Sequence, residues 1–231
     1  MLRALFSGNG DPVVIVMQLL STAFVVFCTL PIHEYAHALV ATKLGDQTAR
    51  LSGRLTLSPL AHIDIFGALM IFIAGVGYAK PVPVNMYNLK TKNKKVGMAL
   101  VALAGPVSNV IMAAIFMLLN NICSVIYMYT QMPELLATII AYFFYFAASI
   151  NISLAVFNLV PVPPLDGSRI LFAIIPDKYY YKIMKYERQI MIVMIVLLMT
   201  GVFSTPIAFL SDFLYKGLNT VISFPFKFLF R

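Results

Sequence analysis

The stretch Pro31-Ile32-His33-Glu34-Tyr35-Ala36-His37 contains two of the chain's three histidines. If the stretch is helical, His33 and His37 lie one turn apart on one face and can direct their imidazoles at a single point. Zinc binds neutral imidazole nitrogens at about 2 Å, so this pair supplies two of the protein ligands of an open zinc site. Glu34 can reach a water beside such a metal and act as general base, which is the H-E-x-x-H pattern of zinc peptidases.

The residues on both sides of this stretch are apolar. Residues 13–30 are almost wholly apolar, and Ala38-Leu-Val-Ala41 follows the motif. Placing two histidines and a glutamate in such a helix costs several kcal/mol unless they have partners. The interpretation that these three residues simply face water is therefore the weaker one. The pattern predicts a helix from Val13 to about Leu44, long enough to cross a bilayer, in which Pro31 should kink or loosen the helix just before the histidines.

Composition indicates the class of protein. The chain has 231 residues, of which 61% are hydrophobic and 11% charged, whereas soluble domains have about 25% charged residues. We therefore predict an all-α polytopic membrane protein, a single domain over 1–231 with a core of about 13–175. The net charge of +8 comes from short segments between apolar runs. That distribution is typical of cytoplasmic loops beside an anionic lipid leaflet and argues against a nucleic-acid partner.

Two segments after the motif helix are ambiguous. Residues 47–58 alternate apolar and polar side chains, which predicts a short β-ribbon at the membrane edge, with an ordinary loop as the alternative. The edge of such a ribbon could hold an extended peptide. Residues 63–78 are apolar but short, and both flanks are basic. We predict a re-entrant element there, with a plain short span as the alternative.

The remaining apolar runs complete the expected architecture. Residues 96–129 and 135–160 predict two long spans joined by a short loop, and Asn109 in the first should face the protein interior. Residues 176–231 predict an interfacial segment rich in tyrosine, an extra span at about 190–210 and an amphipathic basic tail. Together these segments give about four to six transmembrane or re-entrant helices.

A second polar constellation follows the last long span of the core, in Asn158-Leu-Val-Pro-Val-Pro-Pro-Leu-Asp166-Gly167. The prolines end the helix and hold the chain extended, which presents Asp166 at a corner on the same side of the membrane as the histidines. Asp166 could be the third metal ligand. His62 and Asp64 are rivals for that position, and Asp166 could instead cap the next helix.

With these motifs identified, the chain resembles the site-2 protease family of intramembrane zinc metalloproteases, in particular its short bacterial branch without PDZ or CBS domains. The motifs are His33-Glu-Tyr-Ala-His37, Asn158-Leu-Val-Pro-Val-Pro-Pro-Leu-Asp-Gly167, Ala104-Gly-Pro-Val-Ser-Asn109 and His62-Ile-Asp64. The resemblance implies that Asp166 completes the site for one zinc ion per chain. It also implies that Asn109 binds the substrate backbone or the transition state.

The resemblance and the motifs together give the expected function. We expect a zinc-dependent metalloendopeptidase that cleaves membrane-anchored protein substrates within or beside their transmembrane segment. It would be a multi-pass protein of a bacterial plasma membrane, in contact with the lipid bilayer, with its active site toward the cytoplasmic side. The alternative is a membrane metal-binding or metal-transport protein that uses the same histidine pair. The sequence identifies neither the substrate nor the oligomeric state.

Overall fold

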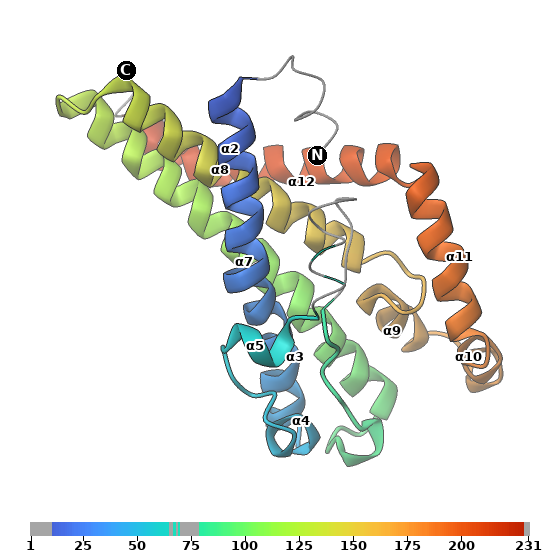
Figure 1. The fold of residues 1–231 in the computed structure, drawn as a ribbon. Helices are drawn as coiled ribbons and strands as arrows, with labels where there is room; N and C mark the ends of the chain where they lie inside the picture. Colours follow the sequence, from blue (N-terminus) through green and yellow to red (C-terminus); the bar gives the residue numbers. More distant parts are fainter. Residues whose placement is uncertain (1–10, 65–66, 68, 70–78, 229–231) are drawn as a thin grey trace.

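The structure is a computed structural model that describes residues 11–64, 67, 69 and 79–228 (Figure 1). Within these residues every regular element is helical and none is a strand. Three helices are long and apolar enough to cross a membrane, namely Pro12–Lys43, Lys94–Tyr129 and Glu134–Asn158. The expected all-α membrane protein is therefore confirmed, whereas a total of four to six spans stays a prediction.

The first long helix is continuous but contains a π-helical segment. It consists of α2 (Pro12–Phe24), the π segment η1 (Val25–Thr29) and α3 (Leu30–Lys43). Pro31 lies in the first turn of α3. Proline has no N–H to donate and its ring clashes with the carbonyl four residues earlier, so a wider turn directly before it relieves the clash. The disturbance predicted at Pro31 is confirmed, and α3 starts afresh three residues before His33.

The other two long helices form an antiparallel hairpin. These are α7 (Lys94–Tyr129) and α8 (Glu134–Asn158), which run side by side in Figure 1. Fully buried alanines lie between them and let the backbones approach closely. The shared core also takes in η1 and a side of α12, through the residues Val25, Ala113, Phe116, Met117, Ala147, Ala148, Ile152 and Val156 and the adjacent Leu214 and Leu218.

The segment after α3 differs from the prediction. Residues 47–58 contain the helical turn α4 (Thr48–Leu51), followed by Gly53 at φ 68°, so the β-ribbon prediction is wrong. Of the apolar side chains that suggested a half-buried strand, Leu51 and Leu57 are exposed at 85% and 57%, whereas Ala49 is fully buried and Leu55 is half-buried. The alternation therefore does not correspond to one buried face. A second short helix, α5 (Pro59–His62), follows.

Asp46 is the reason for the helical turn. Its buried carboxylate accepts hydrogen bonds from the backbone N–H and the hydroxyl of Thr48, at 3.0 and 2.5 Å. It also accepts from the backbone N–H of Asn85 at 2.7 Å and from Asn88 Nδ2 at 3.1 Å, the latter in the 3₁₀ turn η2 (Met86–Asn88). Burial opposes ionisation, but these hydrogen bonds outweigh it and lower the pKa of Asp46. Asp46 thus fixes residues 85–88 to the end of α3.

The C-terminal part consists of four helices and a final 3₁₀ turn, which are α9 (Asp166–Phe172), α10 (Asp177–Met184), α11 (Glu187–Thr200), α12 (Ser204–Ser223) and η3 (Phe224–Phe228). The span predicted at 190–210 is divided, because Gly201 ends α11 in the left-handed region at φ 78°. The 14 residues of α11 cover only about 21 Å, less than a bilayer core of about 30 Å. Most of the predicted re-entrant element at 63–78 lies outside the described residues.

Candidate metal centre

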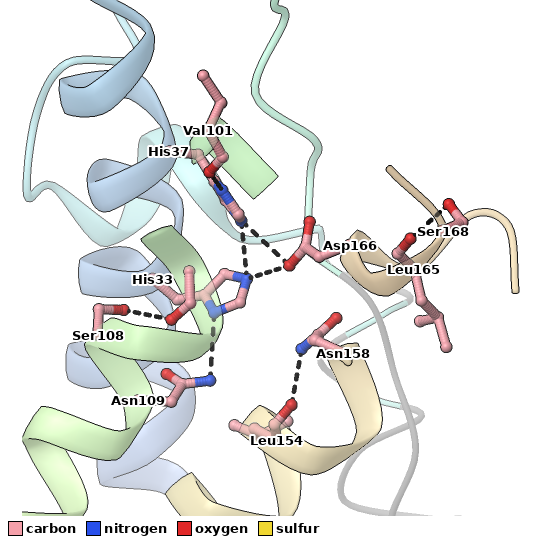
Figure 2. Close-up of polar contacts among 11 residues, drawn as sticks. His33, His37, Val101, Ser108, Asn109, Leu154, Asn158, Leu165, Asp166 and Ser168 are labelled. Atoms are coloured by element: carbon pink, nitrogen blue, oxygen red, sulfur yellow. Dashed lines mark hydrogen bonds and ion pairs between the residues drawn. The ribbon is translucent and has the colours of Figure 1, made fainter. Parts of the chain in front are cut away.

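The histidine pair lies on the buried side of α3. His33 and His37 are 4% and 8% exposed, and Glu34 between them is 8% exposed. Their Nε2 atoms are 3.0 Å apart, and the two rings are nearly perpendicular at 85°. The one-turn spacing read from the sequence therefore does bring both imidazoles to one point (Figure 2).

Asp166 reaches the same point from α9. Its Oδ2 atom lies 3.3 Å from His33 Nε2 and 3.3 Å from His37 Nε2. Asp166 does not act as the N-cap, because Leu165 occupies that position and its carbonyl accepts from the N–H and the hydroxyl of Ser168. The side chain of Asp166 is thus directed at the histidines, and capping does not explain it.

The two rivals for the third position are engaged elsewhere. The Nε2 atom of His62 lies 2.7 Å from the carbonyl of Thr56, and Asp64 accepts from the backbone N–H of Gly67 at 2.9 Å. In the described part of the chain, the only group of three or more His, Cys, Asp or Glu side chains that converges within 4.8 Å consists of His33, His37 and Asp166.

Hydrogen bonding defines which nitrogen of His37 is free. His37 Nδ1 lies 2.8 Å from the carbonyl oxygen of Val101 on α7. A carbonyl only accepts hydrogen bonds, so Nδ1 carries a proton. In the neutral ring, which is the form that binds a metal, Nε2 then holds the lone pair. His37 can therefore direct the lone pair of Nε2 at the centre, beside the carboxylate of Asp166.

The spacing of the three atoms fits a tetrahedral metal ion. Ligands about 2.0–2.1 Å from a tetrahedral centre lie about 3.3 Å from one another, and the three separations here are 3.0, 3.3 and 3.3 Å. Asp166 Oδ2 is buried and has no hydrogen-bond partner. An orphaned carboxylate oxygen beside two imidazole nitrogens is costly without a cation, and two nitrogens with one carboxylate oxygen are donors that zinc accepts.

Two glycines make this convergence sterically possible. A Cβ added at Gly105 of α7 would lie 2.4 Å from His37 Nε2 and 2.5 Å from His33 Cε1. A Cβ at Gly167 would lie 2.2 Å from the carbonyl oxygen of Leu159, at the end of α8. Gly167 is therefore needed for the close approach of the start of α9 to the chain that leaves α8 at Leu159, which sets the position of Asp166, and not for a left-handed turn.

The centre opens into a cavity of about 390 Å³. Glu34, both histidines and Asp166 line this cavity together with Asn158 and the segment from Ala79 to Val84. Asn109, in contrast, does not line it. Asn109 is 1% exposed, and its Nδ2 atom lies 3.2 Å from His33 Nδ1, on the side of the ring that faces away from Asp166 (Figure 2). The expected contact between Asn109 and substrate therefore has no support in the position of its side chain.

Comparison with known proteins indicates a family of zinc metalloproteases. A family model described as "Peptidase family M50" matches residues 117–201. The chain is 44% identical over 172 residues to a Bacillus subtilis (strain 168) protein named "Putative zinc metalloprotease YwhC", and the match covers 73% of this chain and 75% of that protein. The chain belongs to the M50, or site-2 protease, family. This membership confirms the resemblance read from the motifs.

More distant relatives match a smaller share of their own length. The Mycobacterium tuberculosis (strain ATCC 25618 / H37Rv) protein named "Putative zinc metalloprotease Rip2" is 30% identical over 145 residues. The match covers 60% of this chain, but only 51% of Rip2, so the chain spans about half the length of that relative. "Zinc metalloprotease MJ0392" of Methanocaldococcus jannaschii is 25% identical over 156 residues, which are 68% of this chain and 34% of that protein. No solved structure gives a significant match.

Sequence reasoning missed two contributors to the centre in this M50 chain. The backbone carbonyl of Val101 has no side-chain signature, and Gly105 acts by lacking a side chain. Val101, Gly105 and Asn109 follow one another on α7 at intervals of four residues. His33 and His37 are separated by the same interval on α3. Besides the Ala104–Asn109 motif, which contains Gly105, this matching interval of four is a sequence signal that connects the two helices.

Proposed function

We propose that this chain is a zinc-dependent intramembrane endopeptidase that cleaves membrane-anchored proteins within or beside their transmembrane segment. The observation that carries the proposal is the convergence of His33, His37 and Asp166 beside Glu34, in one cavity of a chain with three membrane-length helices. The names of the M50 relatives, which specify zinc metalloproteases, support the same metal and reaction class.

Each side chain of the centre receives a role from its position. His33, His37 and Asp166 would hold one zinc ion, which polarises a peptide carbonyl and acidifies water when bound. Glu34 lines the same cavity and is the general base. It takes a proton from the attacking water and then passes it to the leaving amine, which balances the hydrolysis of one peptide bond.

The cavity wall supports an extended substrate. A helical substrate must unwind locally before its carbonyls are free to react. In the segment from Pro81 to Val84, which lines the cavity, Val82 and Val84 alternate with prolines and lie outside any helix. The guanidinium of Arg54 donates to the carbonyls of Lys80 and Pro81, at 3.3 and 3.0 Å, and holds this wall in place. An unwound peptide can lie along it as a strand.

Charge distribution supports a cytoplasmic position for the centre. His37 lies six residues before Lys43, about 9 Å along the axis of α3. The basic residues Lys80, Lys90 and Lys94 belong to the segment that returns to this end of the bundle. By the positive-inside rule this distribution supports a cytoplasmic position for that end, in a multi-pass protein of the plasma membrane.

Zinc content is the first test. Wild type purified in detergent should hold about one zinc ion per chain, and Asp166→Ala and His37→Ala should each lose it. The variant His62→Ala is a matched control, since His62 is a buried histidine outside the convergent group. Zinc that remains tightly bound in Asp166→Ala would refute the proposed ligand set.

Cleavage tests the reaction. A tagged single-span peptide with a helix-breaking residue, reconstituted with the enzyme in liposomes, should be cut by wild type. Glu34→Gln should keep zinc and lose at least about 100-fold in cleavage rate, because general-base catalysis contributes about 10²–10⁴. Glu134→Gln, at the exposed start of α8, is the control and should cleave normally. Full activity of Glu34→Gln would remove Glu34 as the base.

The same liposomes examine the metal-transport alternative. A transport pathway needs polar sites along its length, whereas in the described part of the chain the convergent metal donors form one group at one level. Zinc flux into protein-containing liposomes, without cleavage of any span, would favour transport over proteolysis.

A further inference from the structure

Asn109 contacts the Nδ1 atom of His33, just as Val101 contacts the Nδ1 atom of His37. Val101 and Asn109 both lie on α7, eight residues apart, with Gly105 midway between them. The carbonyl of Val101 is 2.8 Å from His37 Nδ1, and the amide of Asn109 is 3.2 Å from His33 Nδ1. Each imidazole of α3 therefore has its outer nitrogen against a polar group of α7 and its inner nitrogen at the centre.

The role of His33 Nε2 as a metal ligand determines which hydrogen-bond partner His33 Nδ1 needs. A metal ligand must offer a lone pair, so a zinc ion on Nε2 leaves the only ring proton on Nδ1. That proton then needs a hydrogen-bond acceptor, because His33 and its surroundings are buried. Asn109 is the polar side chain at that atom, and only its Oδ1 can accept.

The amide of Asn109 is free to turn to this orientation. With Nδ2 toward His33, the Oδ1 atom is buried and has no hydrogen-bond partner. A rotation of the amide by 180° exchanges the two atoms and breaks no other hydrogen bond recorded for that side chain. The rotation places an acceptor at Nδ1 when zinc is bound.

We propose that Asn109 is a positioning residue that accepts a hydrogen bond from His33 Nδ1–H and so keeps His33 Nε2 as a metal ligand. This inference rests on the proposed zinc site, and it differs from the substrate contact that the resemblance implied. Helix α7 thus supports both ligands of α3: it has a carbonyl at Val101, an empty position at Gly105 and an amide at Asn109. Groups that orient metal-bound histidines in this way typically change metal affinity 10–100-fold.

Zinc affinity, measured by competition with a chelator, tests the proposal. Asn109→Leu removes the acceptor with little change of volume and should weaken zinc binding by about 10–100-fold. Asn109→Asp keeps an acceptor and should remain within about threefold of wild type. Asn151→Leu is the matched control, because Asn151 is also buried, with an unpartnered Oδ1, and lies outside the metal centre.

A spectroscopic measurement on wild type does not depend on the variants' folding. The chain has three histidines, so ¹⁵N labelling of histidine gives three imidazoles to assign. In the zinc-loaded protein, His33 should show a protonated Nδ1 and a metal-bound Nε2. An unprotonated Nδ1, or a folded Asn109→Leu that binds zinc as tightly as wild type, overturns the proposal. His33→Ala separates the two claims: if it loses zinc while Asn109→Leu does not, only the role of Asn109 fails.

Discussion

Replacing Gly105 with alanine tests whether α7 leaves room for the two imidazoles. The new Cβ would lie 2.4 Å from His37 Nε2 and 2.5 Å from His33 Cε1, whereas ordinary contacts are 3.4–4 Å. One or both rings must therefore move by about 1 Å, which is several times the tolerance of about 0.2 Å for metal–ligand distances. We expect the zinc dissociation constant to rise at least about 100-fold, equivalent to about 2.8 kcal/mol.

The same substitution should not weaken the metal-free fold. Alanine favours a helix over glycine by roughly 0.5–1 kcal/mol, and the imidazoles can turn toward the adjoining cavity. Helix content by circular dichroism and thermal unfolding in detergent should therefore match wild type for the apo protein. This separation of metal affinity from fold stability distinguishes the close approach from general damage to α7.

The assay is chelator competition for zinc on purified apo protein, with cleavage as a second readout. Gly217→Ala on α12 is the control, because its Cβ would meet nothing within 4 Å. Gly105→Ala with zinc affinity within threefold of wild type would show that the rings do not need this space, and the reasoning from the Cβ contacts would be refuted.

Other substitutions probe the supports of the centre. Gly167→Ala should lower stability and zinc affinity together, because its Cβ would lie 2.2 Å from the backbone oxygen of Leu159 and would push Asp166 away from the histidines; thermal unfolding and zinc content measure both effects. Asp46→Ala should lower the free energy of unfolding by about 1–3 kcal/mol, since buried donors lose their acceptor. Folding lowers the pKa of Asp46. The difference in free energy of unfolding between wild type and Asp46→Ala should therefore have its full size above the unfolded pKa of about 3.9, and it should shrink as the pH falls below that value. A difference between the two proteins that grew toward acid pH would contradict this assignment.

The sequence by itself determined the membrane class and identified His33 and His37 as candidate metal ligands, with Asp166 among the candidates for the third position. Long apolar runs leave the chain no other way to satisfy its backbone than helices in lipid, and α7 and α8 begin and end close to the predicted limits. The one-turn interval of His33 and His37 fixes their common face wherever the helix lies. Pro31 and the prolines before Asp166 act through covalent geometry, so their local effects were also predictable.

Tertiary structure decided what depends on partners distant in the chain. The period-2 pattern at 47–58 suggested a strand, but Asp46 bonded to Thr48 and Asn85 made a helical turn instead, and no spacing rule reveals that competition. The choice of Asp166 over His62 required the packing of α9 against α7, which places the Asp166 carboxylate 3.3 Å from both imidazoles. The orientation of Asn109 toward His33 likewise follows from the crossing of two helices and not from the sequence of either one.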